Sequence, residues 1–379
     1  MNMFFNLIIK RFKTEPVRTL FVVVAIASVI SVVLILEGFR EGIYQQIRHM
    51  VISRGADVIV SQAGIKNMIA SRSVLPQLSR MDVEEISGVI DAHPITTLPV
   101  IYNKDNRRTP VFILVFDTLG GPEVIEKGRS IKESREIVID KSLSTIYGLQ
   151  PGDDFIVSDF NFKVAGISKD TAAFFAPFAF ATYDDLIDLY FESDIVGDLS
   201  TLPLLSFLLV KIEAGYEAEF IASEIESRIP AADAWLPNML AENDVEMSRS
   251  MLGAVFQLMI IIAYIISVLV ISLIMFSSIQ NRKYELAVFK AMGFSFFRLA
   301  SAVVVEVLLI TLLAMPVASI MASVFSVIIH EAAPVYLLLV TEPGPLLRTL
   351  VASLSFALFG ALLSFKSIAA LEPVMAFRS

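Results

Sequence analysis

Residues Leu20–Leu36 read LFVVVAIASVISVVLIL, and three further apolar stretches of this kind close the chain: Met251–Ile279, Leu299–Ile329 and Leu346–Phe365. About twenty apolar residues cross the hydrocarbon core of a bilayer as a helix, at roughly 1.5 Å per residue. Four transmembrane helices are therefore predicted, in the order one plus three. Residues 41–248 have the composition of a soluble domain, so this order predicts a large domain outside the bilayer between the first and second helices.

The composition agrees with a partly membrane-embedded protein. The 379 residues are 55% hydrophobic and 18% charged, and the mean hydropathy is +0.70, which is too apolar for a soluble globular protein. The formal net charge of −9 argues against a nucleic-acid partner. Cysteine is absent, which excludes disulfide bonds and thiolate metal sites. The histidines, His49, His93 and His330, share no ligand spacing, so no metal site is expected.

The first apolar stretch has a second interpretation, a cleaved signal peptide, because Lys10, Arg11, Lys13 and Arg18 precede it. We favour an uncleaved anchor. The apolar run is longer than a usual signal core and continues into Glu37-Gly38-Phe39-Arg40 without a small-x-small cleavage site.

Basic residues give the orientation, because cytoplasmic loops of membrane proteins are enriched in Lys and Arg. They cluster before the first span, between the second and third spans, and after the fourth span. Between the third and fourth spans none occurs before Arg348. Both termini and the short central loop are therefore expected in the cytoplasm, and the large domain outside. The clusters after the first span are Arg282, Lys283, Lys290 and Arg298, and then Lys366 and Arg378.

These features divide the chain into nine segments. They are a cytoplasmic amphipathic segment (1–19), the first transmembrane helix and stalk (20–40), the external domain (41–248), the second transmembrane helix (249–280), a cytoplasmic loop (281–297), the third transmembrane helix (298–329), an external loop (330–345), the fourth transmembrane helix (346–366) and a cytoplasmic tail (367–379).

The external domain is predicted to be α+β. Short apolar runs predict strands at 56–60 and 95–102 around a helix at 81–90, and strands at 205–212 and 233–236 around a helix at 216–229. Two such βαβ halves complete one sheet with helices on one face. Segments 41–105 and 205–248 are therefore predicted to form one split βαβ subdomain.

The segment between these halves, 106–204, is predicted to be an inserted β-rich subdomain. Turns are indicated by Gly120-Gly121-Pro122 and Pro151-Gly152. The predicted strands are 111–115, 136–139, 155–157, 162–167 and 178–182.

No catalytic constellation is visible, since nucleophile-elbow, zinc-protease and Walker patterns are all missing from the sequence. The paired carboxylates Asp153-Asp154 and Asp184-Asp185 fall at a predicted turn and a predicted helix start, where capping roles are common. Residues 172–180 (AAFFAPFAF) have two interpretations. A buried strand broken by a proline is favoured, and the alternative is an apolar contact for a lipid or hydrophobic cargo through Phe174, Phe175 and Phe178.

The segment Asn281–Ser295 (NRKYELAVFKAMGFS) carries the most characteristic motif of the chain. It is compatible with a short amphipathic helix, in which Leu286, Phe289 and Met292 form an apolar stripe. Gly293 is placed to take the left-handed conformation that ends such a helix. A plain juxtamembrane loop with basic anchors is the alternative.

This segment resembles the R-x-x-E-[IL]-x-x-x-[KR]-A-[LM]-G segment after the second span of MacB/FtsX-class ABC transporter permeases. Three further matches follow in the same order as in that class. Glu306 lies in VVVEVLL (303–309), similar to F-L-x-E-A-x-x-L. ALEPVMAFR (370–378) is similar to x-x-P-x-x-A-L-R. YGLQPGD (147–153) and FKVAGI (162–167) are similar to L-G-x-x-x-G-D and F-x-V-x-G-I.

The resemblance implies a stand-alone permease subunit of a type VII ABC transporter in the bacterial cytoplasmic (inner) membrane. No ATPase is fused to the chain, so ATP and Mg are expected on a separate cytoplasmic ABC ATPase, with no cofactor or catalytic residue here. A second permease, identical or related, is expected to pair with it. The residues expected to couple to the ATPase are Arg282, Glu285, Lys290, Ala291, Gly293, Pro373 and Arg378.

The resemblance also implies two functional alternatives. Gly38-Phe39-Arg40-Glu41 is similar to Dev-type exporter permeases, which would imply a periplasmic membrane-fusion protein, an outer-membrane channel and membrane lipids as partners. The cargo would then be a lipid, glycolipid, lipoprotein or hydrophobic compound taken from the periplasmic side. The alternative is an FtsX-like signalling subunit that activates a cell-wall hydrolase. Met315-Pro316 departs from the class, which often has glycines there.

Glu306 is predicted to lie inside the hydrocarbon region, about 12 Å beyond Arg298 at roughly 1.5 Å per residue. An isolated carboxylate is costly at that depth, so it should face a neighbouring helix rather than lipid. Ser, Thr or backbone groups of the second span, or a second permease, are the expected partners. A structural role is favoured over cargo binding.

Overall fold

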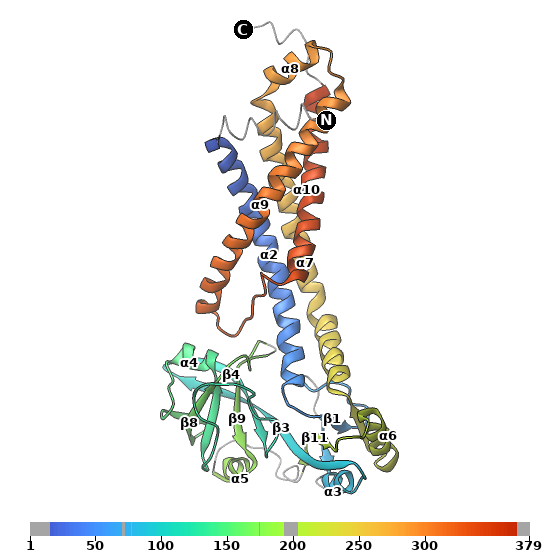
Figure 1. Ribbon diagram of the computed structural model, residues 1–379. Helices are drawn as coiled ribbons and strands as arrows, with labels where there is room; N and C mark the ends of the chain where they lie inside the picture. The colour runs from blue at the N-terminus through green and yellow to red at the C-terminus, as the bar shows by residue number, and fades with distance from the viewer. Residues whose placement is uncertain (1–15, 70–72, 77, 174, 193–203, 370–379) are drawn as a thin grey trace. The chain divides into compact units, whose positions relative to one another are not determined.

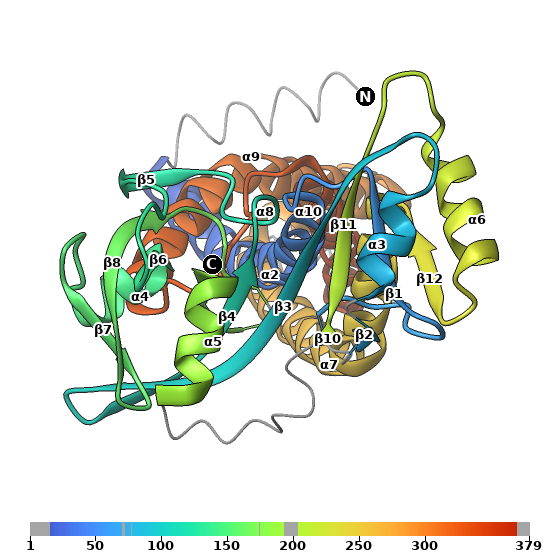
Figure 2. The same ribbon diagram turned by 90° about the horizontal axis from the view of Figure 1, so that it is seen from below.

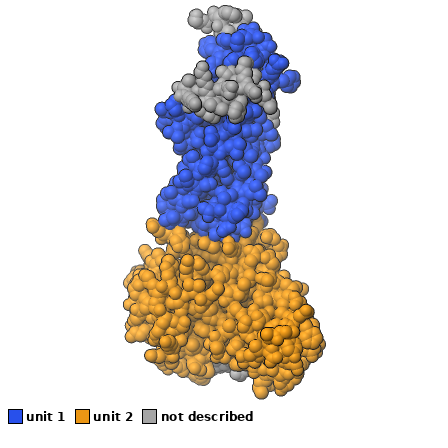
Figure 3. Space-filling model, in the orientation of Figure 1, with its two compact units in different colours: residues 1–41, 254–329, 338–379 blue, residues 42–253, 330–337 orange. Residues whose placement is uncertain are grey.

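The computed structural model describes residues 16–69, 73–76, 78–173, 175–192 and 204–369, and it divides into two compact units (Figure 3). The first, here called the helical unit, comprises Met1–Glu41, Ala254–Ile329 and Leu338–Ser379. The second, here called the α/β unit, comprises Gly42–Gly253 and His330–Leu337.

Four long helices supply the helical unit, and each contains a stretch long and apolar enough to cross a membrane. They are α2 (Pro16–Ile52), α7 (Pro237–Gln280), α9 (Phe296–Ala332) and α10 (Pro343–Ala369) (Figure 1). The short helix α8 (Lys283–Ala291) joins α7 to α9. The prediction of one helix, a large domain and then three helices is confirmed, because all four predicted apolar stretches fall within these helices.

Small residues let two helices of this unit approach closely. Ala27 and Ser31 of α2 are buried. A Cβ atom at Gly360 of α10 would lie only 3.1 Å from the Ser272 hydroxyl oxygen of α7 and 3.3 Å from its Cα. Glycine is therefore what permits the contact between α7 and α10. Pro316 lies inside α9, where it removes one backbone hydrogen bond without ending the helix.

The first half of the α/β unit is the predicted split βαβ arrangement. The sheet order is β12-β1-β11-β3, and every neighbouring pair is antiparallel. Helix α3 (Leu78–Glu84) precedes β3, and α6 (Ala218–Arg228) joins β11 to β12. The strands are β1 (Val58–Gln62), β3 (Val89–Lys104), β11 (Phe207–Ile212) and β12 (Ala232–Trp235).

The inserted segment continues this sheet rather than starting another. Strand β3 pairs with β11 through its first residues and with β4 from Ile95 onward, so one strand serves both halves. All five strands predicted in the insertion are present. They are β4 (Arg107–Phe116), β6 (Glu136–Asp140), β7 (Asp154–Val157), β8 (Phe160–Ser168) and β9 (Phe178–Thr182), and the structure adds β5 (Ile125–Gly128) and a separate pair, β2 (Leu75–Pro76) with β10 (Leu204–Leu205).

Helices cover both faces of the first half of the sheet. Successive residues of a strand point to opposite faces, so neighbouring residues of β1 contact different helices. Val58 and Val60 of β1 pack with α3 and α6, which lie on the same side of the strands in Figure 2. Ile59 packs on the other face with Met50 of α2 and Leu240 of α7. The sequence predicted helices on one face and did not predict that the ends of α2 and α7 cover the other.

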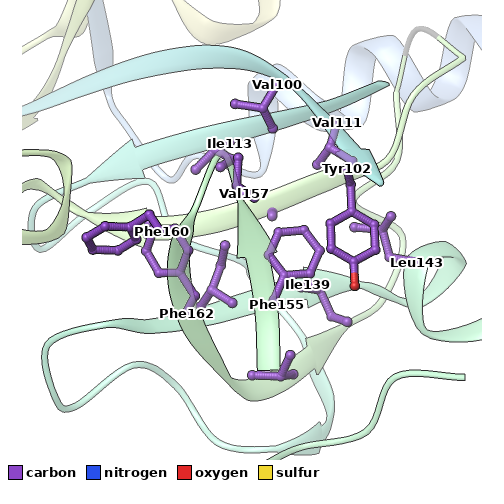
Figure 4. Packing of buried hydrophobic residues seen from close by; sticks show 14 of the residues in the cluster. Val100, Tyr102, Val111, Ile113, Ile139, Leu143, Phe155, Val157, Phe160 and Phe162 are labelled. Carbon is purple, nitrogen blue, oxygen red and sulfur yellow. The ribbon is translucent and has the colours of Figure 1, made fainter. Parts of the chain in front are cut away.

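The insertion has a core of its own, in which aromatic side chains pack among aliphatic ones (Figure 4). Tyr102 of β3 stacks on Phe155 of β7 with ring centroids 4.2 Å apart, and Phe160 meets Phe162 at 4.7 Å. Helices α4 (Lys141–Tyr147) and α5 (Tyr183–Glu192) close this core. The sequence predicted only the start of α5 and did not predict α4.

The helix predicted at 81–90 is shorter than expected. Helix α3 ends at Glu84, and Val89 and Ile90 already belong to β3. Gly88 has φ of +96°, and its missing side chain leaves room for the ring of Tyr216. The chain reverses at this glycine, which is why the apolar residues after it join the sheet.

Candidate functional site

Helix α8 and the turn that follows it form the first candidate site. Gly293 has φ of +89°, and its N–H donates to the Lys290 carbonyl at 3.1 Å. The Phe294 N–H donates to the Phe289 carbonyl at 3.1 Å, and the two rings meet edge to face at 5.7 Å. These two bonds and the apolar contact are those of a Schellman motif. The predicted helix and its glycine end are confirmed.

The side chains of α8 divide into a packed face and an exposed face. Leu286 and Ala287 are buried, and Phe289 is half-buried against the helical unit. Met292, predicted in the apolar stripe with Leu286, is instead 59% exposed. The Met292 N–H still donates to the Val288 carbonyl at 2.9 Å, as in a helix. At 3.6 residues per turn Met292 lies about 120° around the helix from Leu286 and one turn after Val288, on the exposed side. With Tyr284 and Val288, which are 56% and 44% exposed, it forms an exposed apolar face, here called the α8 face.

Arg282, one of the predicted coupling residues, makes a buried contact that the sequence did not predict. One guanidinium nitrogen donates to the Glu306 carboxylate of α9 at 2.6 Å, and Nε donates to Glu285 at 3.3 Å. The Arg282 and Glu306 side chains are only 15% and 12% exposed, whereas Glu285 is 57% exposed. Arg282 therefore attaches the start of α8 to α9.

This ion pair also corrects the expected environment of Glu306. We predicted Ser, Thr or backbone partners, because no basic residue of the spans lies near it in sequence. Arg282 is nearby in space because its long side chain places the charge far from its backbone and buries its aliphatic stem. The structural role of Glu306 remains our interpretation.

For three of the remaining predicted coupling residues, the structure shows the exposure of the side chain. Glu285 and Ala291 are exposed on α8, and Lys290 is half-buried at its end. Pro373 and Arg378 lie outside the described residues.

A second charged cluster in the helical unit was not predicted. Glu37 of α2 is 1% exposed and accepts hydrogen bonds from Arg348 Nε at 2.9 Å and from the Tyr264 hydroxyl at 3.1 Å. Arg348 also donates to Glu41 at 2.7 Å, and Arg40 pairs with Glu37. The cluster joins α2, α7 and α10. A signal existed in the sequence, since Glu37 and Glu41 are one helical turn apart and Arg348 begins the fourth span.

The predicted cargo contact is largely wrong. Phe178 is buried, with its ring 5.4 Å from that of Phe112, so it cannot meet a cargo. Phe175 has φ of +65° and lies edge to face with Tyr336 at 6.0 Å. Phe174 lies outside the described residues. The favoured interpretation, a buried strand preceded by a break, fits β9.

The paired carboxylates include two that accept structural hydrogen bonds. Asp185 is buried and accepts from the Arg135 N–H at 2.6 Å, the Ser134 hydroxyl at 3.0 Å and the Thr182 hydroxyl at 2.8 Å. Asp153 accepts from the Gln150 N–H at 2.8 Å in the turn before β7. Over the part of the chain that the structure describes, no three His, Asp or Glu residues group closely enough to hold a metal ion.

Two buried charges hold helix ends in the α/β unit. Arg54, just after α2, donates to the Met50 carbonyl at 2.9 Å and the Gly120 carbonyl at 2.6 Å, and burial lowers its pKa to about 10. Asp244 of α7 accepts from the Met68 N–H at 2.9 Å, and burial raises its pKa to about 6. No pattern in the sequence distinguishes either residue from surface charges.

Two family models match the chain. Residues 19–228 match the MacB-like periplasmic core domain, and residues 258–373 match the FtsX-like permease C-terminal region. An uncharacterized ABC transporter permease of Mycobacterium tuberculosis (strain ATCC 25618 / H37Rv) is 24% identical over 365 residues, which cover 95% of each chain. An uncharacterized ABC transporter permease of Mycobacterium bovis is 22% identical over 369 residues, again covering 95% of each chain.

Two solved structures also show similarity. The periplasmic region of MacB from Actinobacillus actinomycetemcomitans is 13% identical with a TM-score of 0.37, covering 50% of this chain and 94% of that one. The extracellular domain of the transporter YknZ from Gram-positive bacteria is 12% identical with a TM-score of 0.35, covering 48% of this chain and 100% of that one.

Proposed function

Because the chain belongs to the MacB/FtsX family of ABC transporter permeases, we propose that it passes the movement of a separate cytoplasmic ATPase to its α/β unit. A permease implies an ATPase partner, and that partner would carry ATP and Mg. In this proposal the protein spans a bacterial inner membrane. The termini and α8 lie on its cytoplasmic side, and the α/β unit lies in the periplasm. A second permease, identical or related, completes the transporter.

The α8 face is the observation that supports this proposal. Tyr284, Val288 and Met292 are exposed apolar side chains on a short helix outside the predicted spans. Apolar side chains grouped at one surface are typical of protein contacts. Behind this face, Leu286 is buried in the helical unit and Arg282 is paired with Glu306. A push on the α8 face would therefore reach α9 through packed side chains and an ion pair.

The cargo we propose is a lipid, glycolipid, lipoprotein or other hydrophobic compound moved from the periplasmic side. A membrane-fusion protein and an outer-membrane channel would complete an exporter. The second candidate is FtsX-like signalling, in which the same movement activates a cell-wall hydrolase, and the FtsX-like match of residues 258–373 supports it. Purification from the native membrane separates them: a membrane-fusion protein should co-purify with an exporter, and a peptidoglycan hydrolase with a signalling subunit.

Val288→Asp tests the coupling proposal. A charge placed in a desolvated apolar contact is costly, so the variant should insert normally but lower the ATP hydrolysis of the reconstituted complex at least tenfold. Ser295→Asp is the matched control. It adds the same charge one turn beyond α8, at the start of α9, where aspartate is also a good N-cap.

Equal ATP hydrolysis in Val288→Asp and wild type would mean that the α8 face makes no contact with the ATPase. Glu285→Lys tests the polar side of the same contact, because a charge reversal creates an unpaired or like-charge pair there.

A further inference from the structure

The α/β unit contains a pocket of about 230 Å³ that none of the predictions above included. Four segments distant in sequence form it: the α2 residues Gln45, Gln46 and His49, the residues from Asp140 to Ser142, those from Lys169 to Ala172, and the stretch from His330, near the end of α9, to Leu337. The volume is below the roughly 300–1,000 Å³ of sites for drug-sized ligands, so it would hold a head group or a small molecule.

The wall formed by residues 334–337 is fixed on α2. A Cβ atom at Gly42 would overlap the carbonyl oxygen of Leu337, so the segment lies directly on the helix backbone. The Gln46 amide donates to the Val335 carbonyl at 2.8 Å. Tyr336 is further held by its edge-to-face contact with Phe175.

The opposite wall is fixed by Asp140. Its Oδ1 accepts from the Ser142 N–H at 2.8 Å and from the Ser142 hydroxyl, and its Oδ2 accepts from the Thr171 hydroxyl at 2.6 Å. Asp140 is buried, and both of its carboxylate oxygens already accept hydrogen bonds from donors within the wall. Both walls are thus formed before any ligand arrives, which reduces the entropy lost on binding.

The polar groups left facing the pocket are mainly donors. Lys141 and Lys169 contribute two ammonium groups, which are 44% and 53% exposed. Their carboxylate partners, Glu126 and Asp170, form exposed ion pairs of the kind that contributes little and exchanges readily. His49 and His330 add two imidazoles, neither of which has a side-chain hydrogen-bond partner among the described residues.

Gln45 and Asp170 complete the polar lining. The rest of the lining is apolar. Ala172 lies on one wall, and Pro334, Tyr336 and Leu337 lie on the other. An inorganic anion would leave this surface unused. A ligand that fits both parts therefore combines an anionic group with a short apolar portion.

We propose that this pocket binds the phosphate group of an amphiphilic phosphomonoester, with Lys141, Lys169, His49 and His330 donating to its oxygens and Tyr336 and Leu337 contacting its apolar portion. Charge-assisted hydrogen bonds from ammonium groups to phosphate are among the stronger polar contacts in proteins. The phosphate could be carried by a lipid, whose chains would leave through the open side, or by a soluble molecule. The proposal stands apart from the coupling proposed above, because binding is measured without an ATPase.

The test uses the full chain in detergent and fluorescently labelled dioctanoyl phosphatidic acid as the probe, followed by anisotropy. Unlabelled dioctanoyl phosphatidic acid should displace it, and dioctanoyl phosphatidylcholine should be at least tenfold weaker because choline shields its phosphate. Phenyl phosphate represents a soluble source, and inorganic phosphate should need at least a hundredfold higher concentration. Phenyl phosphate displacing better than the unlabelled lipid would support the site and assign it to a soluble ligand.

The variants separate the two parts of the pocket. His49→Gln/Lys141→Gln should weaken binding at least tenfold, and Lys163→Gln, an exposed lysine on β8 outside the pocket, should leave it unchanged. Lys169→Gln provides a second charge variant at an exposed position if the double variant does not fold. Tyr336→Ser should weaken phenyl phosphate more than inorganic phosphate. Wild-type binding in both charge variants, or equal competition by phosphatidylcholine and phosphatidic acid, would overturn the proposal.

Discussion

Arg282 illustrates how one side chain can make a buried carboxylate tolerable inside an apolar helix. Glu306 lies ten residues into α9, where an isolated charge is costly. The Arg282 guanidinium lies 2.6 Å from it and both side chains are largely shielded from solvent. When one partner of such a pair is removed, the other stays buried and unpaired, at a cost of about 3–5 kcal/mol.

Variants of this pair should therefore differ in a defined order. Glu306→Leu is expected to lower the thermal midpoint of the detergent-solubilised protein most, because Arg282 loses its partner. Glu306→Gln should lower it less, since the amide oxygen still accepts a hydrogen bond. The double variant Arg282→Met/Glu306→Leu should regain part of the loss. Midpoints from fluorescence-detected gel filtration provide the measurement, and a double variant no better than Glu306→Leu would contradict a structural pair.

Glu136 gives the α/β unit a pH dependence that can be measured. Hydrogen bonds from Arg129, together with those from the Lys132 and Glu133 N–H groups, lower the pKa of Glu136 from 4.5 to about 2. Between these values the unfolded chain takes up a proton that the folded chain does not. The stabilisation is therefore complete above pH 4.5 and is lost as the pH falls toward 2. Because Arg129 is 42% exposed, solvent screening reduces this stabilisation.

Glu136→Gln should accordingly flatten the loss of stability between pH 6 and pH 3. Urea unfolding followed by circular dichroism at the two pH values checks this, and Glu224→Gln, an exposed carboxylate on α6, is the control. An unchanged pH profile in Glu136→Gln would show that this carboxylate is not responsible.

Among the elements, the contact between α7 and α10 depends on a single missing side chain. The nearest atoms to a Cβ at Gly360 are the hydroxyl oxygen, Cα and backbone nitrogen of Ser272, and two of these belong to the backbone. Backbone cannot move aside as a flexible side chain can.

Gly360→Val should therefore separate α10 from α7 and lower the thermal midpoint of the helical unit by several degrees, consistent with about 1–3 kcal/mol for overpacking. Ser355→Val places the same valine side chain at an exposed position of the same helix, where there is room for it, and should change little. Similar midpoints for the two variants would mean that the helices are not in close contact at Gly360.

The elements show why parts of the fold could be predicted from the sequence. The spans and the strands were predictable because apolar length and alternation are local properties. Gly293 was predictable because one residue type dominates that helix end. Helix α4 was not, since its seven residues depend on the Asp140 cap and on Leu143 entering the core.

The candidate sites were harder to predict than the fold. The contact between Arg282 and Glu306 was not predicted, because a motif gives residue types and does not say where a side chain points. The pocket was not predicted because its four segments are distant in sequence and no motif joins them. Met292 was assigned to the wrong face because two successive steps of three residues from Leu286 turn about 120° around a helix of 3.6 residues per turn.

At the scale of the whole molecule, the proposed orientation has a direct test. The chain lacks cysteine, so single cysteines can be introduced without background. Cysteines at Lys127 and Glu331, both exposed, should react with a membrane-impermeant maleimide in intact cells, and one at the exposed Lys283 should react only after permeabilisation. Reaction of the Lys283 position in intact cells would contradict the proposed topology.

The α/β unit also has a constraint on how its two halves can move. Strand β3 has 16 residues and pairs with β11 at one end and β4 at the other. The insertion is therefore part of the sheet and cannot swing about a flexible linker. Any movement passed to this unit must twist the sheet or carry it as one body.

The hydrogen bond from Gln46 to Val335 joins residues 289 positions apart. The ribosome must make almost the entire chain, including the third span, before the segment that lies on Gly42 exists. Residues 42–253 can complete their sheet during synthesis, but one wall of the pocket is added only when residues 334–337 have followed. A fragment that ends before the third span would therefore lack the binding pocket, and ligand binding would mark molecules whose synthesis has passed the third span.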